Sequence, residues 1–371
     1  MTKSETKLFF FALVLSSAGC RDEFNPPATA ASLNYLVVDG FINAGNTTTN
    51  FKLSRTLNLI DTVFYKPERG ATMTIEGDNN FISVLHEDSA GSYSGGPYNF
   101  SSGSKYRVHI KTTGGKEFFS DFVPVNISPP IDSVGWERNK EGVLIYVNTH
   151  DQTNNTRYYH WRYTQTWKFH AAYQSSLQYK DGFLVTRLNY DSIYTCWHTE
   201  ESNQLVLGSS AALSENVIYK QPVISIPENS WQIMDKYSIL VKQEAIDEGA
   251  FKYMQVLRKI TELSGSVFDP QPSTINGNIH CINDNTQVAI GYIYATSVTE
   301  KRIFIDNSEL PGWVYQPGCY TFYALTPSDL EFVAAGYYIP IAANNIGILL
   351  TTDFCGNCTI RGTHQKPDFW P

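Results

Sequence analysis

The sequence predicts a mainly β protein, with an N-terminal immunoglobulin-like β-sandwich followed by a larger β-rich domain that contains one long and one short helix. Three observations lead to this prediction. Short strand-like runs recur from residue 34 onward and are separated by turn residues. Aromatic residues, which favour strands, make up 14% of the chain, and charged residues only 17%. The first convincing helical period begins at residue 246.

Residues 1–19 have the pattern of a secretory signal peptide. Lys3 and Lys7 precede the apolar run Leu8–Leu15, and small residues lead up to Cys20. A cysteine directly after Ala-Gly is typical of a bacterial lipoprotein signal, in which the thiol takes up a diacylglycerol before cleavage. A transmembrane helix needs about 20 apolar residues, which this run does not reach. We therefore expect Cys20 to be lipidated and to begin the mature chain, with a plain secreted protein as the alternative.

Residues 20–33 are predicted to be a lipidated tether, because they contain Pro26, Pro27 and a run of small residues. Arg21-Asp22-Glu23 resembles the tag that sends lipoproteins of the phylum Bacteroidota to the outer face of the outer membrane. The alternative is an ordinary solvated tether. Two acyl chains such as palmitate already hold a protein stably on a membrane. The predicted location is the outer membrane, with the protein lipid-anchored and exposed at the cell surface.

Residues 34–127 are predicted to form the immunoglobulin-like sandwich. A hairpin turn is expected at Thr113-Gly114-Gly115, between the last two of its strands. Ile127-Ser128-Pro129-Pro130 is expected to end the domain, because paired prolines cannot join a ladder. The expected strands are Tyr35–Ile42, Thr49–Leu57, Ala71–Glu76, Phe81–His86, Tyr106–Thr112 and Lys116–Val123.

Residues 128–371 are predicted to form the second, β-rich domain. Within Arg157–Tyr173 five aromatic residues alternate along one strand face, interrupted only by Gln165. Most such aromatics lie in a core, but this face is also a candidate platform for stacking sugars. Further strands are expected at Ser133–Arg138, Gly142–Asn148, Ile193–Thr199, Gln204–Leu207, Val217–Ile226, Tyr237–Gln243, Gln287–Thr296 and Lys301–Ile305.

The long helix is predicted over 246–263, where apolar residues recur at helical spacing and Gly265 follows as a stop. Glu248 and Lys252 would form an i,i+4 ion pair on its polar face. We expect this helix to cover a sheet rather than to bind a partner helix. The short helix is expected to begin after Thr326 as cap, with Pro327 at its first position.

Five cysteines remain beside Cys20, and disulfides persist outside the inner membrane. Most lie near the C-terminus, so this part of the chain is predicted to be stapled by disulfides. The odd number leaves one thiol free or paired outside the chain, and the spacing leaves the connectivity open. The disulfide candidates are Cys196, Cys281, Cys319, Cys355 and Cys358.

Cys355-Gly356-Asn357-Cys358 also has the spacing of a redox pair or of half a zinc site. A redox pair needs a helix N-terminus to stabilise the thiolate, and the flanking residues predict strands instead. Zinc would need two further ligands, for which Cys281, Cys319 and His364 are the only candidates. Structural disulfides are therefore the preferred interpretation, and we predict no bound metal.

No catalytic constellation is visible. The eight histidines are scattered, without a zinc-protease pair, and no Gly-x-Ser-x-Gly elbow occurs. The Ser-x-x-Lys spacing at Ser102–Lys105 lies in a Gly/Ser turn, and the acidic clusters at 76–80 and 283–285 lack the spacing of a calcium loop. The formal net charge of −8 argues against nucleic-acid binding. We predict a protein that is not an enzyme and uses no cofactor; its ligand-binding residues stay unassigned.

Several scattered motifs together resemble the Bacteroidota lipoproteins of domain-of-unknown-function family 4249, over nearly the whole mature chain. They are Tyr35–Gly40, Leu53–Thr56, Pro129–Ser133, Cys196-Trp197, Phe268–Pro272 leading to Gly277–Ile279, and Cys355–Trp370. The resemblance implies no reaction and no catalytic residues. Its members tend to be encoded beside TonB-dependent receptors, which implies a surface accessory to nutrient uptake.

The favoured hypothesis is thus a non-enzymatic surface lipoprotein that binds a partner or ligand beside a TonB-dependent receptor. An adhesin or glycan binder, using the aromatic strand at Arg157–Tyr173, is the alternative. A third hypothesis is a hydrolase whose site is assembled from loops. The C-terminal Trp370 either anchors on a partner or locks the chain end against the second domain, and the lock is preferred.

Overall fold

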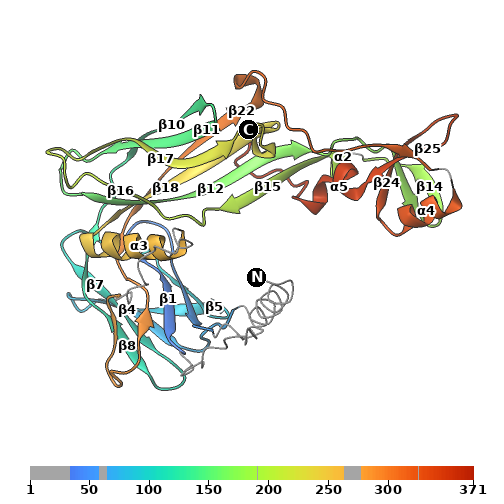
Figure 1. The fold of residues 1–371 in the computed structure, drawn as a ribbon. Coiled ribbons are helices and arrows are strands. Elements are labelled where there is room, and N and C mark those ends of the chain that lie inside the picture. The colour runs from blue at the N-terminus through green and yellow to red at the C-terminus, as the bar shows by residue number, and fades with distance from the viewer. Residues whose placement is uncertain (1–33, 58–64, 190, 263–276, 325) are drawn as a thin grey trace, which may run out of the picture.

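The computed structural model describes residues 34–57, 65–189, 191–262, 277–324 and 326–371. The predicted signal peptide, Cys20, the tether, Gly265 and the Phe268–Pro272 motif lie outside the described residues. The described chain is mainly β, as predicted, and it builds two β units and a projecting arm (Figure 1).

The N-terminal unit is a 12-stranded sheet that curls around one apolar core. Its main path runs β2-β21-β9-β7-β4-β5-β6-β3-β1-β20, and β8 and β19 pair beside β7. Alternation along the strands explains the core: in β3, Phe51 and Leu53 are buried while Lys52 is exposed. The hairpin expected at residues 113–115 joins β7 to β8. The strands are β1 (Leu36–Gly40), β2 (Ile42–Asn43), β3 (Thr49–Arg55), β4 (Thr72–Gly77), β5 (Ile82–Ser89), β6 (Ser92–Gly95), β7 (Lys105–Lys111), β8 (Glu117–Ser120), β9 (Val123–Asn126), β19 (Ile279–Cys281), β20 (Ala289–Ile290) and β21 (Ala295–Thr296).

The last three of these strands come from a part of the chain that the sequence places in the second domain. Ala289 pairs with Leu36, and Ala295 lies between Ile42 and Val125, all in parallel register. Instead of one strand over 287–296, two short strands flank the buried Ile293. Parallel pairing joins segments distant in sequence, so local patterning does not reveal it. The N-terminal unit is therefore discontinuous, and the range 128–371 is not a single packed body.

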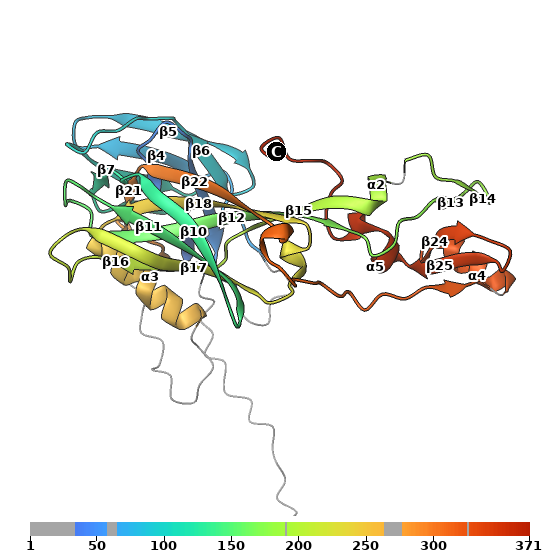
Figure 2. The ribbon, with the colours of Figure 1, turned by 90° about the horizontal axis from the view of Figure 1, so that it is seen from above.

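The second unit is a sandwich of a three-stranded and a five-stranded sheet, seen from above in Figure 2. The smaller sheet has the order β10-β11-β17; in the larger, β15-β12-β18-β22 run side by side and β16 pairs with β12. Both sheets contribute to one core cluster. The strands are β10 (Ile131–Asn139), β11 (Gly142–His150), β12 (Tyr158–His170), β15 (Thr195–Glu201), β16 (Val206–Ser209), β17 (Val217–Pro227), β18 (Lys236–Ile246) and β22 (Val298–Asp306).

The aromatic face of β12 lies inside this sandwich. Its large side chains are at most 3% exposed, and Gln165 sits among them with its amide oxygen accepting from the Tyr237 hydroxyl at 3.0 Å. The polar interruption is thus satisfied within the core. The buried aromatics of this face are Tyr159, Trp161, Tyr163, Trp167 and Phe169.

The long helix α3 (Glu248–Thr261) begins two residues after the predicted start. Asp247 caps it by accepting from the Ala250 amide, and the predicted Glu248–Lys252 ion pair is present at 2.6 Å. Its apolar stripe packs Phe251 and Met254 against the end of β16 and Tyr294. Figure 1 shows α3 between the N-terminal unit and the larger sheet of the second unit. The helix therefore covers a sheet, as predicted, and also fills the junction of the two units.

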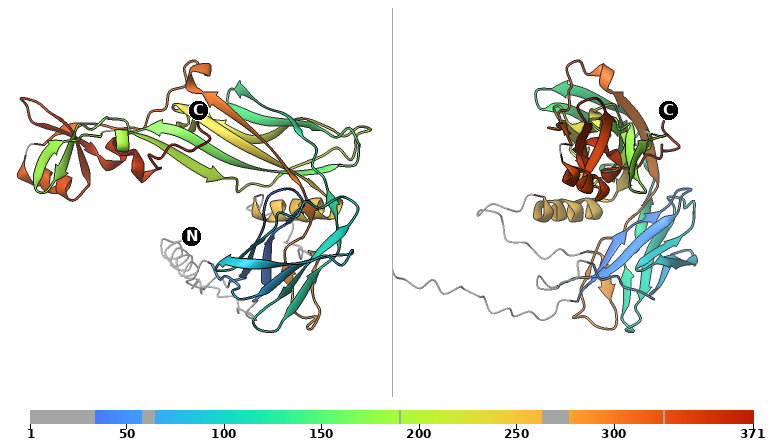
Figure 3. Two further views of the ribbon diagram at one scale, coloured as in Figure 1. Left: turned by 180° about the vertical axis from the view of Figure 1, so that it is seen from behind. Right: turned by 90° about the vertical axis from the view of Figure 1, so that its right-hand side faces the viewer.

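The arm consists of residues 172–194 and 314–357 and projects from one end of the second unit (Figure 3). A hairpin of β13 and β14 lies beside the sheet β23-β25-β24. A hydrogen bond joins the two, in which the Ser176 amide donates to the Ile341 carbonyl at 2.8 Å. The short helix predicted after Thr326 is α4 (Pro327–Ala334). The other elements are β13 (Leu177–Lys180), β14 (Phe183–Thr186), α2 (Asp191–Tyr194), β23 (Phe322–Tyr323), β24 (Tyr338–Ala343), β25 (Ile348–Thr352) and α5 (Asp353–Gly356).

Candidate functional site

A cleft of about 1110 Å³ lies at the junction of the N-terminal unit, the larger sheet of the second unit and α3. β1 and β3 form one wall, with outward-facing Asp39 and Lys52. α3 contributes Tyr253 and Leu257, and the loop 202–205 closes another side. Segments far apart in sequence therefore converge here, which is the usual setting of a ligand site between domains.

A buried ionic cluster forms the floor of this cleft. Glu244 on β18 lies directly opposite His160 on β12, and its carboxylate is fully buried. His160 Nδ1 lies 3.0 Å from Glu244 Oε2, and the Tyr294 hydroxyl donates to the same oxygen at 2.8 Å. Arg162, two residues along β12, donates from Nε to Glu244 Oε1 at 2.7 Å. A buried carboxylate needs such partners, because unpaired burial of a charge is very costly.

The electrostatics of the cluster follow from this geometry. Burial alone would raise the pKa of Glu244, but the hydrogen bond and charge of His160, then the charge of Arg162, hold that pKa down at about 2. Burial beside this carboxylate raises the pKa of the Tyr294 hydroxyl well above its ordinary value. Glu244 is thus ionised at neutral pH, and the cluster ties β12 and β18 to Tyr294, which directly precedes β21.

The arm presents a second candidate surface, of a different kind. Large apolar side chains on it are open to solvent, with Leu188 94% and Phe183 72% exposed. Large exposed apolar side chains gathered on one part of a protein are a feature of interaction sites. The exposed members on the arm are Tyr179, Phe183, Val185, Leu188, Val314, Tyr320, Phe332, Tyr337, Ile346 and Phe354.

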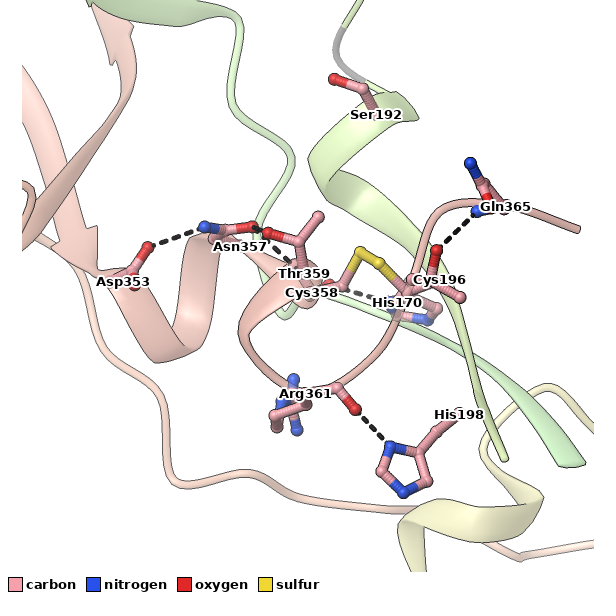
Figure 4. The surroundings of a disulfide bond; sticks show 12 residues. His170, Ser192, Cys196, His198, Asp353, Asn357, Cys358, Thr359, Arg361 and Gln365 are labelled. Atoms are coloured by element: carbon pink, nitrogen blue, oxygen red, sulfur yellow. Dashed lines mark hydrogen bonds between the residues drawn. A yellow bond between two sulfur atoms is a disulfide. The ribbon is translucent and has the colours of Figure 1, made fainter. Parts of the chain in front are cut away.

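Four of the five predicted disulfide cysteines are paired. Cys196 on β15 is bonded to Cys358 (Figure 4). Cys319 is bonded to Cys355 at the base of the arm. Cys281 is buried in the N-terminal core as a free thiol. The cysteines of the C-x-x-C motif are bonded to distant partners rather than to each other, so the motif is structural. The prediction that no helix borders the motif is wrong, because Cys355 lies within the one-turn helix α5, which Thr352 precedes as cap.

The proposed stacking platform on β12 is wrong as well. Its aromatic rings are enclosed by the two sheets of the second unit and cannot contact a sugar. The polar face of the same strand is what reaches the cleft, through His160 and Arg162. Sequence reasoning treated His160 as a scattered histidine and did not single out Glu244. The sequence feature that could have indicated the buried cluster was Glu244, a carboxylate within a strand-like run, two residues before the strand ends at Ile246.

The other candidate clusters from the sequence form common turn and ion-pair structures. Asp284 of the acidic group at 283–285 makes an ion pair with Lys116 at 2.5 Å and closes a turn with Thr286. Within the described ranges, no group of three or more His, Cys, Asp or Glu side chains is arranged to hold a metal ion. In the same ranges, no histidine is hydrogen-bonded to a serine, threonine or cysteine side chain. None of the described helices is both long and apolar enough to cross a membrane.

The C-terminal Trp370 acts as a lock, as the preferred interpretation expects. Its side chain is 6% exposed and packs edge-on against Phe304 on β22 and Trp197 on β15, with ring centroids 5.5 Å and 6.4 Å away. The preceding Phe369 is stacked on Arg302, 3.6 Å from the ring centroid, but is 41% exposed.

Replacing Trp370 by alanine is expected to lower the free energy of unfolding by about 3 kcal/mol, because a large buried ring is lost. Phe369→Ala, next to it but half-exposed, should cost about 1 kcal/mol. Urea unfolding followed by circular dichroism measures both. Equal effects of the two substitutions would contradict the lock.

Comparison with known families covers most of the chain. A model of the family described as domain of unknown function DUF4249 matches residues 21–302. The chain belongs to the DUF4249 family. The match runs through the N-terminal unit, the cleft and the larger sheet, and ends within β22, so the DUF4249 region stops before the C-terminal half of the arm. No curated protein matches the chain.

Proposed function

We propose that this DUF4249 protein is a lipid-anchored, surface-exposed outer-membrane accessory that binds a TonB-dependent receptor through its arm and performs no reaction itself. The observation that carries the proposal is the arm, with its exposed apolar side chains held away from both β units. The lipoprotein pattern ending at Cys20 supports attachment to the outer membrane. The choice of partner follows what the family resemblance implies, an accessory to a TonB-dependent receptor.

Two disulfides at its base favour the arm as a binding element. Cys319–Cys355 closes the loop that carries α4 and β23–β25, and Cys196–Cys358 fastens that loop to β15. A rigid, preformed element loses less conformational entropy on binding than a flexible one. Exposed Phe183 and Leu188 would then be desolvated at the partner surface, where aromatic and apolar anchors contribute most of the affinity.

Co-purification from detergent-solubilised outer membranes at native expression tests the proposal. The wild-type chain is expected to retain a TonB-dependent receptor, and Phe183→Asp with Leu188→Asp should reduce its recovery about tenfold. The matched control is Ile82→Asp with Val84→Asp, which places the same charges on exposed apolar positions of β5.

Three results would overturn the proposal. They are absence of any receptor with the wild-type chain, equal loss with the control pair, and full recovery with the arm pair. Mass spectrometry of the same preparation tests the anchor separately. An acylated Cys20 as the first residue is expected, and an unmodified amino terminus would contradict the lipid attachment.

A further inference from the structure

We propose that the cleft between the two units binds a neutral oligosaccharide. This inference goes beyond the proposed function, because it needs neither the arm nor a receptor. The cleft is lined by the N-terminal unit, α3 and the polar face of β12, whereas the arm leaves from the far end of β12 and β15 (Figure 1).

Beside Arg162, four charged side chains line the cleft, two of each sign, and these four form no ion pair. Among the described residues, Asp39, Lys52, Lys242 and Glu300 have no salt-bridge partner, although all four line the cleft. A ligand with one sign of charge would be attracted by one set and repelled by the other. Hydroxyl groups both donate and accept hydrogen bonds, so a polyhydroxylated neutral ligand can use all four side chains.

Two side chains at the floor of the cleft each have a nitrogen atom without a hydrogen-bond partner among the described residues. Arg162 is held by Glu244 through Nε and Nη2, while its Nη1 has no hydrogen-bond partner in the described parts of the chain. His160 is 5% exposed, and its Nε2 is likewise unpaired there. A buried, unpaired polar atom carries a desolvation cost that a ligand hydroxyl can remove. Because the Glu244 cluster fixes both side chains, these groups are already oriented before binding.

Aromatic rings supply the apolar part of the lining. Phe41 is stacked on Tyr294, with ring centroids 5.2 Å apart, and Arg162 lies over the Phe41 ring. Tyr253 on α3 lies beside Tyr292, with ring centroids 5.6 Å apart. The tyrosine rings combine a flat apolar face with a polar hydroxyl, and therefore suit a sugar ring that has C–H faces and hydroxyl edges.

The size of the cleft also fits an oligomer. At about 1110 Å³ the cleft exceeds the range of roughly 300–1,000 Å³ that is typical of small-molecule pockets. Exposed amides line it as well, at Asn50, Asn203 and Gln204. Several sugar units placed along the cleft would each contact hydrogen-bond donors, hydrogen-bond acceptors or aromatic rings of the lining.

Isothermal titration calorimetry on the wild-type mature chain tests the inference. The probes are neutral tetrasaccharides of glucose, mannose, xylose and galactose, with an acidic uronic-acid tetrasaccharide and a mixed tetrapeptide pool as competing classes. At least one neutral tetrasaccharide is expected to bind. Asp39→Ala and Lys52→Ala should each weaken that binding about fivefold or more. The matched controls are Asp78→Ala and Lys111→Ala, exposed residues of the same unit that do not line the cleft.

Several outcomes would overturn the inference. They are binding by none of the neutral probes, binding only by the acidic or peptide probes, and neutral binding that the Asp39 and Lys52 variants leave unchanged. Circular dichroism of every variant excludes misfolding as the cause of a loss. Recovery of the receptor should be the same for these variants as for the wild type, so failure of this inference and failure of the proposed function give different results.

Discussion

Replacing Cys196 and Cys358 together by alanine is expected to lower the free energy of unfolding by about 5 kcal/mol. The two cysteines are 162 residues apart, and their disulfide closes a loop that contains β16, β17, β18 and β22 of the second unit and the C-terminal half of the arm. Breaking so long a loop gives the unfolded chain much conformational freedom. Both residues are also fully buried in the core of the second unit, so their loss leaves space in packed surroundings.

Urea unfolding followed by tryptophan fluorescence measures this change, because Trp167 and Trp231 belong to or pack against the same core. Cys281→Ala is the matched control: it removes a buried cysteine that has no disulfide, and it should cost about 1 kcal/mol. A double variant as stable as the Cys281 variant would show that the disulfide contributes little beyond its packing.

Glu244→Gln is expected to destabilise the protein by about 3–5 kcal/mol, because removing one member of a buried ionic cluster leaves the others uncompensated. Arg162 and His160 would lose the carboxylate that accepts their hydrogen bonds. The junction of the two units should also loosen, since Tyr294 of the N-terminal unit donates to the same carboxylate. Glu300→Gln on the neighbouring strand is the matched control, because Glu300 is exposed, and it should change stability by less than about 0.5 kcal/mol.

The pH dependence gives an independent measurement of the same group. The pKa of Glu244 is lowered from 4.5 to about 2, because the charges and hydrogen bonds of His160 and Arg162 outweigh the effect of burial. A carboxyl with a lowered folded-state pKa stabilises the protein fully above its unfolded-state pKa. That stabilisation is lost as the pH falls from about 4.5 to about 2. The wild type should therefore lose stability over this window more steeply than Glu244→Gln, and parallel curves would contradict the prediction.

Local sequence patterns predict much of this fold, for a physical reason. Strand alternation and helix caps depend on neighbouring residues, so the β7–β8 hairpin, the capping of α4 and the inward face of β12 follow from the sequence. The pairing of β20 with β1 does not, because a two-residue strand has no period and its partner lies some 250 residues away. The discontinuity of the N-terminal unit was missed for that reason.

The cleft was harder to predict than the fold. Its floor depends on the register of β12 against β18, which places His160 opposite Glu244 across 84 residues. Neither residue belongs to a sequence motif that indicates a site, and a single histidine on a strand usually has no functional role. The disulfide candidates could be identified because any cysteine can form a disulfide, wherever it lies in the sequence. Their pairing could not be predicted, because it depends on the three-dimensional path of the arm.

The return of β19, β20 and β21 to the N-terminal unit constrains the order in which the chain can fold as it is synthesised. Because synthesis proceeds in the N-to-C direction, a segment that ends at residue 127 still lacks the strand that lies between β2 and β9. Ile42 and Val125 stay without this neighbour until residue 296 has been synthesised. The N-terminal unit therefore has an unfilled strand position for most of synthesis, and the second unit is complete in sequence only shortly afterwards, with β22.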